Sequence, residues 1–123
     1  MIHGTVNDRL EAVVQIAVRG SDDTPVSVDA VIDTGFSDYL TLPENLVQTL
    51  DLQRIGPTDA KLADGQLVSL DVYGAIVDWE GVPRDILIVA AGSGPLVGMK
   101  LIEGCNLSIR VRPGGGVTID QAK

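Results

Sequence analysis

The sequence predicts a mainly β protein that folds as one domain spanning residues 1–123. Two features of composition favour this class: 14 glycines and 6 prolines divide the chain, and the short segments between them are rich in Val, Ile and Leu. With 123 residues the chain is long enough to bury a core of its own without disulfide bonds. We therefore expect a β architecture with one or two short helices.

Two strands joined by a turn are predicted near the start of the chain. Residues 11–19 (EAVVQIAVR) and 26–33 (VSVDAVID) are the strands, and residues 21–25 are the turn. The second strand begins with alternating apolar and polar residues and becomes wholly apolar at residues 30–32. It therefore runs into the interior and ends on the carboxylate of Asp33. Because a buried carboxylate is costly unless it is paired, protonated or solvated, Asp33 is a candidate functional residue.

Helix signals occur in two places. A helix is predicted over residues 41–50, where Thr41 and Glu44 have the spacing of a capping box and the apolar residues share one face. A shorter helix is expected over residues 99–103, with Gly104 as its terminator.

Three hairpins account for the other predicted strands. Asp-Gly and Glu-Gly pairs between apolar segments are typical hairpin turns, and a glycine-rich turn joins the last two segments. The expected hairpins turn at Asp64-Gly65, at Glu80-Gly81, and between residues 107–112 and 117–120.

Charge and hydropathy argue against two classes of partner. Nine basic and 17 acidic residues give a net charge of -8, which repels nucleic acid and anionic membranes. The longest mostly apolar segment, residues 86–99, is interrupted by glycine and proline and is shorter than the roughly 20 residues of a membrane-spanning helix. Asp8, Arg9 and Glu11 interrupt any signal peptide. We therefore expect a soluble, cytoplasmic protein with no nucleic-acid or membrane partner.

No metal or cofactor site is expected. Cys105 is the single cysteine and has no Cys or His at metal-ligand spacing, so a small buried thiol is the simplest interpretation. His3, the single histidine, has no Ser or Cys nucleophile near it in the sequence. The Gly92-Ser93-Gly94 loop lacks both the P-loop lysine and the Rossmann spacing of nucleotide sites.

The strongest candidate for chemistry is the tripeptide Asp33-Thr34-Gly35. Such a tripeptide alone is common in turns. Here it follows an apolar strand, and the apolar-apolar-Gly element Leu96-Val97-Gly98 comes later in the chain. With these motifs the sequence resembles the retropepsin-like aspartic peptidases, in particular their small single-domain bacterial and archaeal members. The resemblance covers almost the whole chain, through the segments IHGTV, VIDTGFS, LTLP, LADGQ, VYGAIVDWEG, DILIV and PLVGMKLIEGCNLSI.

The resemblance implies a closed β-barrel of the acid-protease type and an aspartic endopeptidase in which Asp33 acts through a water molecule. One carboxylate cannot serve as base and acid on opposite sides of a peptide bond in the same step. Since the chain holds one Asp-Thr-Gly, the economical solution is a two-fold homodimer that places Asp33 of each copy side by side. The two carboxylates would then share a proton, as in other aspartic proteases. A polypeptide is the expected substrate.

Roles for the residues around Asp33 follow from the same resemblance. Thr34 is expected to bond across the pair and lock the two loops together, or else to bond within its own loop. Gly35 is expected to meet the substrate through its backbone, or to be only a required turn residue. Ser37 and Asp38 are expected to meet the substrate main chain or to hold the active-site loop, although a solvated surface carboxylate is the simpler interpretation of Asp38.

Roles further along the chain concern the substrate. Asp64, Gly65 and Gln66 would form the tip of a flap that closes over an extended peptide, with an ordinary hairpin turn as the alternative. Leu96 and Val97 would line side-chain pockets, and core packing explains them nearly as well.

Two departures from the viral members of the family affect the expected dimer and substrate. The polar flap tip means that substrate preference cannot be carried over from them. The chain also continues into residues 107–120, so the interleaved terminal strands of viral enzymes are replaced here. If this hairpin pairs with residues 2–6 of its own subunit, the dimer forms differently or weakly. The alternative function is a catalytically silent dimerisation or peptide-binding module of the same fold.

Overall fold

A computed structural model of the chain describes residues 1–61, 64–92 and 94–122. The described part is mainly β, as the sequence predicts. Its elements are β1 (Ile2–Val6), β2 (Ala12–Arg19), β3 (Pro25–Ile32), β4 (Leu40–Leu42), α1 (Glu44–Leu50), β5 (Gln53–Lys61), β6 (Leu67–Trp79), β7 (Val82–Ala90), β8 (Leu96–Val97), β9 (Cys105–Ile109) and β10 (Gly116–Gln121).

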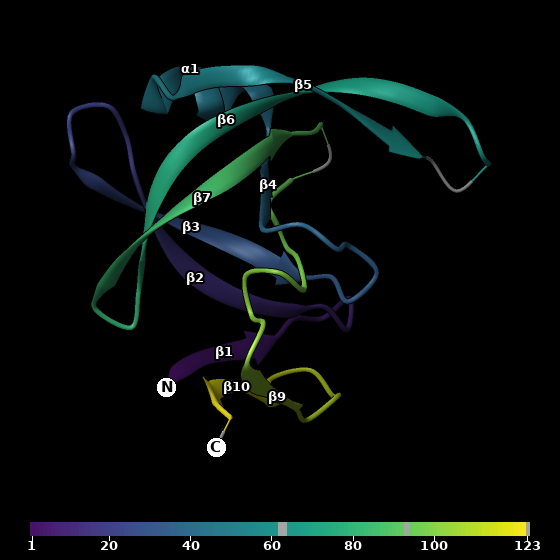
Figure 1. Cartoon of the computed structure of the whole chain (residues 1–123). Coiled ribbons are helices and arrows are strands. Elements are labelled where there is room, and N and C mark those ends of the chain that lie inside the picture. Colours follow the sequence, from purple (N-terminus) through teal and green to yellow (C-terminus); the bar gives the residue numbers. More distant parts are fainter. Residues whose placement is uncertain (62–63, 93, 123) are drawn as a thin grey trace.

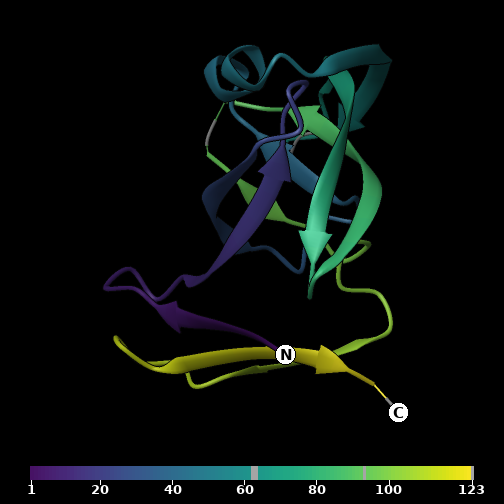
Figure 2. The same ribbon diagram turned by 90° about the vertical axis from the view of Figure 1, so that its left-hand side faces the viewer.

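All of these strands belong to one sheet with the order β5-β6-β7-β4-β8-β3-β2-β1-β10-β9. A further pairing of β6 with β2 sets residues 17–19 opposite residues 76–78. This pairing closes β2, β3, β8, β4, β7 and β6 into a ring (Figure 1). Strands β1, β10 and β9 continue from β2 as a separate layer beneath the ring, where both ends of the chain lie (Figures 1 and 2).

The core lies inside the ring and against the lower layer. Strand β2 shows why: its alternate residues Ala12, Val14, Ile16 and Val18 are buried, while the residues between them are half-buried or exposed. A strand points successive side chains to opposite faces, so alternation of this kind buries one face. Other fully buried members of the core are Leu40, Leu42, Val77, Ile88, Val97, Leu101, Val117 and Ile119.

The predicted capping box is wrong, and the first helix is shorter than expected. Helix α1 begins at Glu44, its N-cap is Pro43, and no side chain caps it. Thr41 lies instead in β4, where its hydroxyl is hydrogen-bonded to the backbone of Gly94 and Leu96. At its other end the helix stops at Asp51, which adopts a left-handed conformation.

The predicted helix over residues 99–103 is also wrong, because this segment forms consecutive turns. The backbone N–H groups of Met99 and Lys100 donate to the carbonyl oxygens of Phe36 and Asp38. The N–H groups of Leu101 and Cys105 donate to the carbonyl oxygens of Gly98 and Ile102, three residues earlier, as in turns.

The three predicted hairpins are confirmed. Strands β5 and β6, β6 and β7, and β9 and β10 are antiparallel neighbours. The turn between β6 and β7 has Glu80 at φ 52° and Gly81 at φ 79°, the left-handed pair that matches the twist of a two-residue hairpin. Strand β10 also pairs with β1, with Ile2 opposite Ile119. The terminal hairpin therefore folds back onto its own chain.

Candidate active site

Asp33 follows directly after β3 and is held there by a neighbouring strand. Strand β3 runs parallel to β8, with Val31 opposite Leu96 and Ile32 opposite Val97. The backbone N–H of Asp33 donates to the carbonyl oxygen of Val97 at 2.9 Å. The apolar residues before Asp33 thus belong to a central strand. Asp33 follows the end of this strand and is half-buried.

The carboxylate of Asp33 is oriented by its own loop. Oδ1 accepts a hydrogen bond from the backbone N–H of Gly35 at 2.9 Å, and the Asp33 carbonyl oxygen accepts one from the N–H of Phe36 at 3.1 Å. This is the local Asx geometry that Asp favours in turns. Thr34 and Gly35 themselves are exposed, so the carboxylate and the loop backbone are both accessible from outside the chain.

Residues 33–39 loop around β8. Strand β8 lies between β3, to which it is parallel, and β4, to which it is antiparallel. Gly98, the residue after β8, donates through its N–H to the carbonyl oxygen of Tyr39 at 2.9 Å. A Cβ on Gly98 would clash with the Asp38 carbonyl oxygen and lie 2.6 Å from the Phe36 ring. The apolar-apolar-Gly element is therefore explained by close approach of two backbones.

The side chain of Thr41 connects β4 to the backbone at β8 from the buried side. Its side chain is buried, with 4% of its surface exposed. Its hydroxyl accepts a hydrogen bond from the N–H of Leu96 at 2.9 Å and donates one to the carbonyl oxygen of Gly94 at 3.2 Å. The sequence predicted Thr41 to be a helix cap. The pattern that indicates its buried position is a single polar residue within the apolar segment YLTLP.

The β5–β6 hairpin forms a long arm that projects from the body on the same side as the 33–39 loop (Figure 1). At its tip Asp64, Gly65 and Gln66 are exposed, and Asp64 Oδ1 accepts the N–H of Gln66 at 3.0 Å. Leu62 and Ala63 of the predicted flap lie outside the described residues. Alternate residues on one face of the arm are half-buried (Thr58, Ala60, Val68, Leu70), and the opposite face is exposed.

The structure brings together most of the predicted site residues. Asp33, Thr34, Gly35, Ser37 and Asp38 share one loop, and β8 lies within it. Ser37 is exposed and borders an open cavity of about 400 Å³ with Met99, Lys100 and Glu103.

The two residues of β8 differ in exposure. Leu96 is half-buried, whereas the side chain of Val97 is fully buried in the core. Val97 therefore contacts the 33–39 loop through its carbonyl oxygen. The flap-tip residues lie on the projecting arm, apart from this group (Figure 1).

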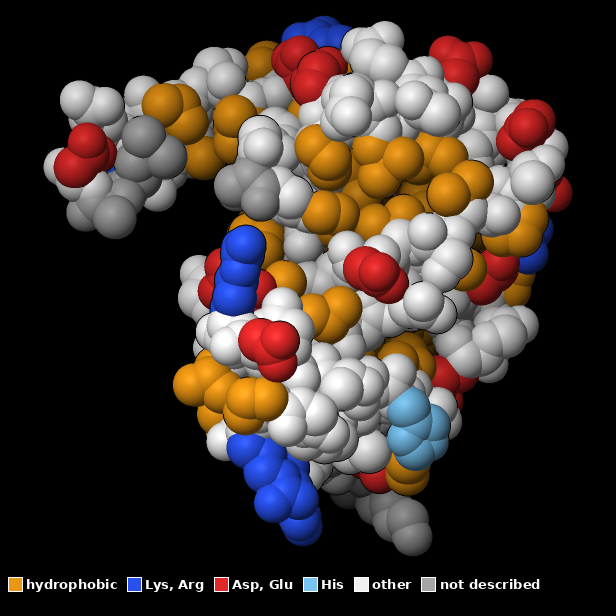
Figure 3. Space-filling model, turned by 180° about the vertical axis from the view of Figure 1, so that it is seen from behind, with side chains coloured by type: hydrophobic (Ala, Val, Ile, Leu, Met, Phe, Trp, Pro, Cys, Tyr) orange, Lys and Arg blue, Asp and Glu red, His pale blue; other side chains and the backbone are white. Residues whose placement is uncertain are grey.

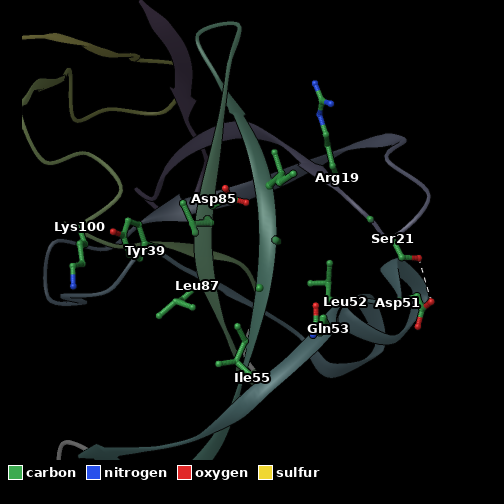
Figure 4. A pocket seen from close by; sticks show the side chains of 15 residues that line it. Arg19, Ser21, Tyr39, Asp51, Leu52, Gln53, Ile55, Asp85, Leu87 and Lys100 are labelled. Carbon is green, nitrogen blue, oxygen red and sulfur yellow. Dashed lines mark hydrogen bonds between the residues drawn. The ribbon is translucent and has the colours of Figure 1, made fainter.

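A larger cavity of about 710 Å³ is lined by none of the predicted site residues, although Tyr39, at the end of the 33–39 loop, lines it. Ile55 and Leu87 lie close together on one side of it, and Ser21 and Asp51 are hydrogen-bonded at another (Figure 4). Seen from behind, the molecule carries a broad group of hydrophobic side chains beside the projecting arm (Figure 3). The larger cavity and the cavity beside Ser37 share Lys100 in their linings.

Tyr73 links β6 to helix α1. Its hydroxyl donates to Glu44 Oε1 at 3.4 Å. Burial raises the pKa of Tyr73 above its ordinary value of 10.0, and the nearby carboxylates of Glu44 and Asp71 raise it further.

Within residues 1–61, 64–92 and 94–122, no group of three or more His, Cys, Asp or Glu side chains is placed to hold a metal ion. In the same part of the chain, no helix has the length and apolar composition needed to cross a membrane.

Comparison with known proteins gives a structural relative. The solution structure of the simian foamy virus (mac) protease matches this chain with a TM-score of 0.52, over 73% of this chain and 90% of that one. The fold is retropepsin-like. Sequence identity in this match is 18%, so the likeness concerns the fold alone. No protein-family model matches the sequence, and no curated protein matches it.

Proposed function

We propose that this protein is an aspartic endopeptidase whose active site forms between two copies of the chain. One observation carries the proposal: in a retropepsin-like fold, the carboxylate of Asp33 directly follows β3 and accepts the N–H of Gly35, while the backbone N–H of Asp33 is bonded to Val97. A carboxylate that is held in one orientation and is still accessible is suited to take part in a proton transfer.

The second copy supplies the second carboxylate. Each chain has one Asp-Thr-Gly, whereas hydrolysis of a peptide bond needs a base for the water and an acid for the carbonyl oxygen. A two-fold axis beside the 33–39 loop places Asp33 of both copies together, and the exposed Thr34 on each loop can bond across the axis. Two adjacent carboxylates share one proton, since like charges a few ångströms apart do not both ionise readily.

The chemistry then divides between the two carboxylates. The ionised Asp33 takes a proton from water, whose oxygen attacks the peptide carbonyl carbon. The protonated Asp33 of the other copy gives its proton to the carbonyl oxygen. The carboxyl that took the proton from water then donates it to the amide nitrogen. As the C–N bond breaks, the other carboxylate takes a proton from a hydroxyl of the tetrahedral intermediate, which leaves one proton on the pair. Cleavage is therefore expected to be fastest at mildly acidic pH, where the pair keeps that proton.

The remaining residues bind an extended peptide. The backbone of Gly35 and the side chains of Ser37 and Asp38 lie on the loop that a bound main chain would follow, and Leu96 is the more exposed residue of β8. The tip formed by Asp64, Gly65 and Gln66 would close over the peptide and exclude water.

The test is incubation of the purified protein with a diverse peptide mixture over a range of pH, beside the Asp33→Asn variant and an aspartic-protease inhibitor. The expected result is cleavage by the wild type at mildly acidic pH, its loss in the variant, and unchanged circular dichroism. Cleavage by Asp33→Asn at the wild-type rate would contradict the proposal. Peptide binding without cleavage by the wild type at every pH would favour the silent peptide-binding module instead.

A further inference from the structure

We infer that two copies of this chain associate through the outer edge of β9, which pairs antiparallel with β9 of the second copy. This inference rests on the proposed function, which needs a second copy to complete the site. It also answers how a dimer forms when the terminal strands are engaged within one chain: residues 2–5 of β1 pair with residues 116–119 of β10.

The two edges of the sheet differ in how they are protected. Edge strand β5 (QRIGPTDAK) carries Arg54, Pro57, Asp59 and Lys61, and its register shifts between Arg54 and Gly56. Charges, proline and irregular register are the devices that keep an edge strand from pairing with another chain. Edge strand β9 (CNLSI) has no charged residue and no proline. Of the two edges, β9 is therefore the one open to a partner strand.

The hydrogen bonds to β10 show which backbone groups face the open edge. Arg110 N–H donates to Gly116 O and Ala122 N–H donates to Gly104 O, both at 2.9 Å. Backbone groups in an antiparallel ladder face opposite sides at successive residues. Even-numbered residues of β9 therefore bond to β10, and the backbone groups of Cys105, Leu107 and Ile109 point outward. The N–H of Cys105 is taken by Ile102 O at 3.0 Å, which leaves two outward N–H groups and three outward carbonyl oxygens.

The side chains of β9 select one register for pairing with a second copy. Cys105, Leu107 and Ile109 are half-buried against the core, and Asn106 and Ser108 are exposed on the other face. Pairing centred on Leu107 sets Leu107 opposite Leu107, Cys105 opposite Ile109, and Asn106 opposite Ser108. Like side chains then face each other, whereas a slip by one residue would oppose Leu107 and Ser108 and mix the two faces.

The same register also gives hydrogen-bond partners to outward N–H and carbonyl groups of β9. Leu107 N–H reaches Leu107 O of the second copy, Ile109 N–H reaches Cys105 O, and the two-fold axis repeats both bonds. The result is a continuous sheet in the order β1-β10-β9-β9-β10-β1. Residues 98–104, which lead into β9, are bonded to the 33–39 loop through Met99 and Lys100. The interface is therefore joined through a short segment to the loop that carries Asp33.

A pair of variants at Leu107 tests the inference by sedimentation. Leu107→Ala and Leu107→Pro both remove most of the side chain, but only the proline removes the N–H that faces the open edge. This N–H makes no bond to β10, so the hairpin ladder is preserved in both. We expect the proline variant to need a concentration about tenfold or more above that of the alanine variant to dimerise, since two hydrogen bonds per dimer are lost. Equal dimerisation of the two variants would overturn the inference.

A cross-link keeps the test decisive if circular dichroism shows that the proline variant fails to fold. In a Cys105→Ser background, Leu107→Cys would place two thiols opposite each other, at a Cα separation of about 5.5 Å in a hydrogen-bonded pair, within the roughly 4.4–6.8 Å that a disulfide spans. Oxidation should link this variant into dimers far more than Ser108→Cys in the same background. Equal linking of both, or none in Leu107→Cys, would contradict the register. Repeating the experiment with Asp33→Asn separates this result from the proposed function, because pairing of β9 does not require the carboxylate.

Discussion

The backbone N–H of Asp33 donates to the carbonyl oxygen of Val97 at 2.9 Å. This bond joins the two motifs that stand far apart in the sequence, the Asp-Thr-Gly tripeptide and the apolar-apolar-Gly element. It means that the position of the Asp33 carboxylate depends on β8, a strand of two residues held between β3 and β4. Changes to residues that hold β8 should therefore disturb the proposed active site even where they do not touch Asp33.

Gly98→Ala should destabilise the fold and reduce cleavage. The added Cβ would clash with the Asp38 carbonyl oxygen and the Phe36 ring, and overpacking of this kind costs about 1–3 kcal/mol. Urea denaturation measures the change in the free energy of unfolding. Gly56→Ala is the matched control, since a Cβ at Gly56 meets no atom within 4 Å in the part of the chain that the structure describes. A loss no larger in Gly98→Ala than in Gly56→Ala would contradict the packing of the 33–39 loop on Gly98.

Thr41→Val should lower the free energy of unfolding by about 1–3 kcal/mol, because the N–H of Leu96 loses its buried acceptor. Valine keeps the shape of threonine, so the change removes the hydroxyl and little else. Thr41→Ser keeps the hydroxyl and should retain more of the stability and of the cleavage rate. If Thr41→Val denatures at the wild-type urea concentration, the hydroxyl does not hold β8.

Gly65→Ala should reduce cleavage through the flap. Gly65 and Gly81 are both hairpin glycines with positive φ, 88° and 79°, and among the described residues a Cβ added to either would meet no atom within 4 Å. An alanine in this conformation costs about 1–2 kcal/mol at either site. The two variants should thus lose similar stability by denaturation, while only Gly65→Ala lowers the cleavage rate. Equal cleavage rates in the two variants would argue against a role for this tip.

Alkaline pH should weaken the fold through Tyr73. Its folded pKa is raised by burial and by Glu44, so the neutral phenol is favoured in the folded state. The stabilisation is complete below the unfolded pKa of about 10 and is lost as the pH rises through the higher folded value. Denaturation on either side of that pH should show a smaller alkaline loss in Tyr73→Phe than in the wild type. The same loss in both proteins would mean that other groups cause it.

Much of the fold could be predicted from local patterns. The alternation in β2 and the turn pairs Glu80-Gly81 and Asp64-Gly65 depend on neighbouring residues only, so the strands and hairpins could be located from short segments of the sequence. The two helix errors have the opposite origin. Thr41 fits a capping box locally, and residues 99–103 fit a short helix, yet both make hydrogen bonds to distant parts of the chain instead.

The candidate site was also predicted only in part, because some of its features are local in the sequence and others depend on contacts between distant segments. Asp33, Thr34 and Gly35 are recognisable by their residue types and by the apolar strand before them, and Gly98 by its place after two apolar residues. The parallel pairing of β3 with β8 and the buried hydroxyl of Thr41 involve segments that only the folded chain brings together. The burial of Val97 follows from that pairing, which places its side chain in the core.

Mixing active and inactive subunits tests the shared pair of carboxylates most directly. Wild-type protein at fixed concentration is combined with increasing Asp33→Asn, and peptide cleavage is measured while capture through a tag on one partner confirms that mixed dimers form. If both Asp33 residues are needed, the cleavage rate per wild-type chain falls as the variant recruits wild-type subunits into inactive mixed dimers. A rate per wild-type chain that stays constant while mixed dimers accumulate would contradict the account.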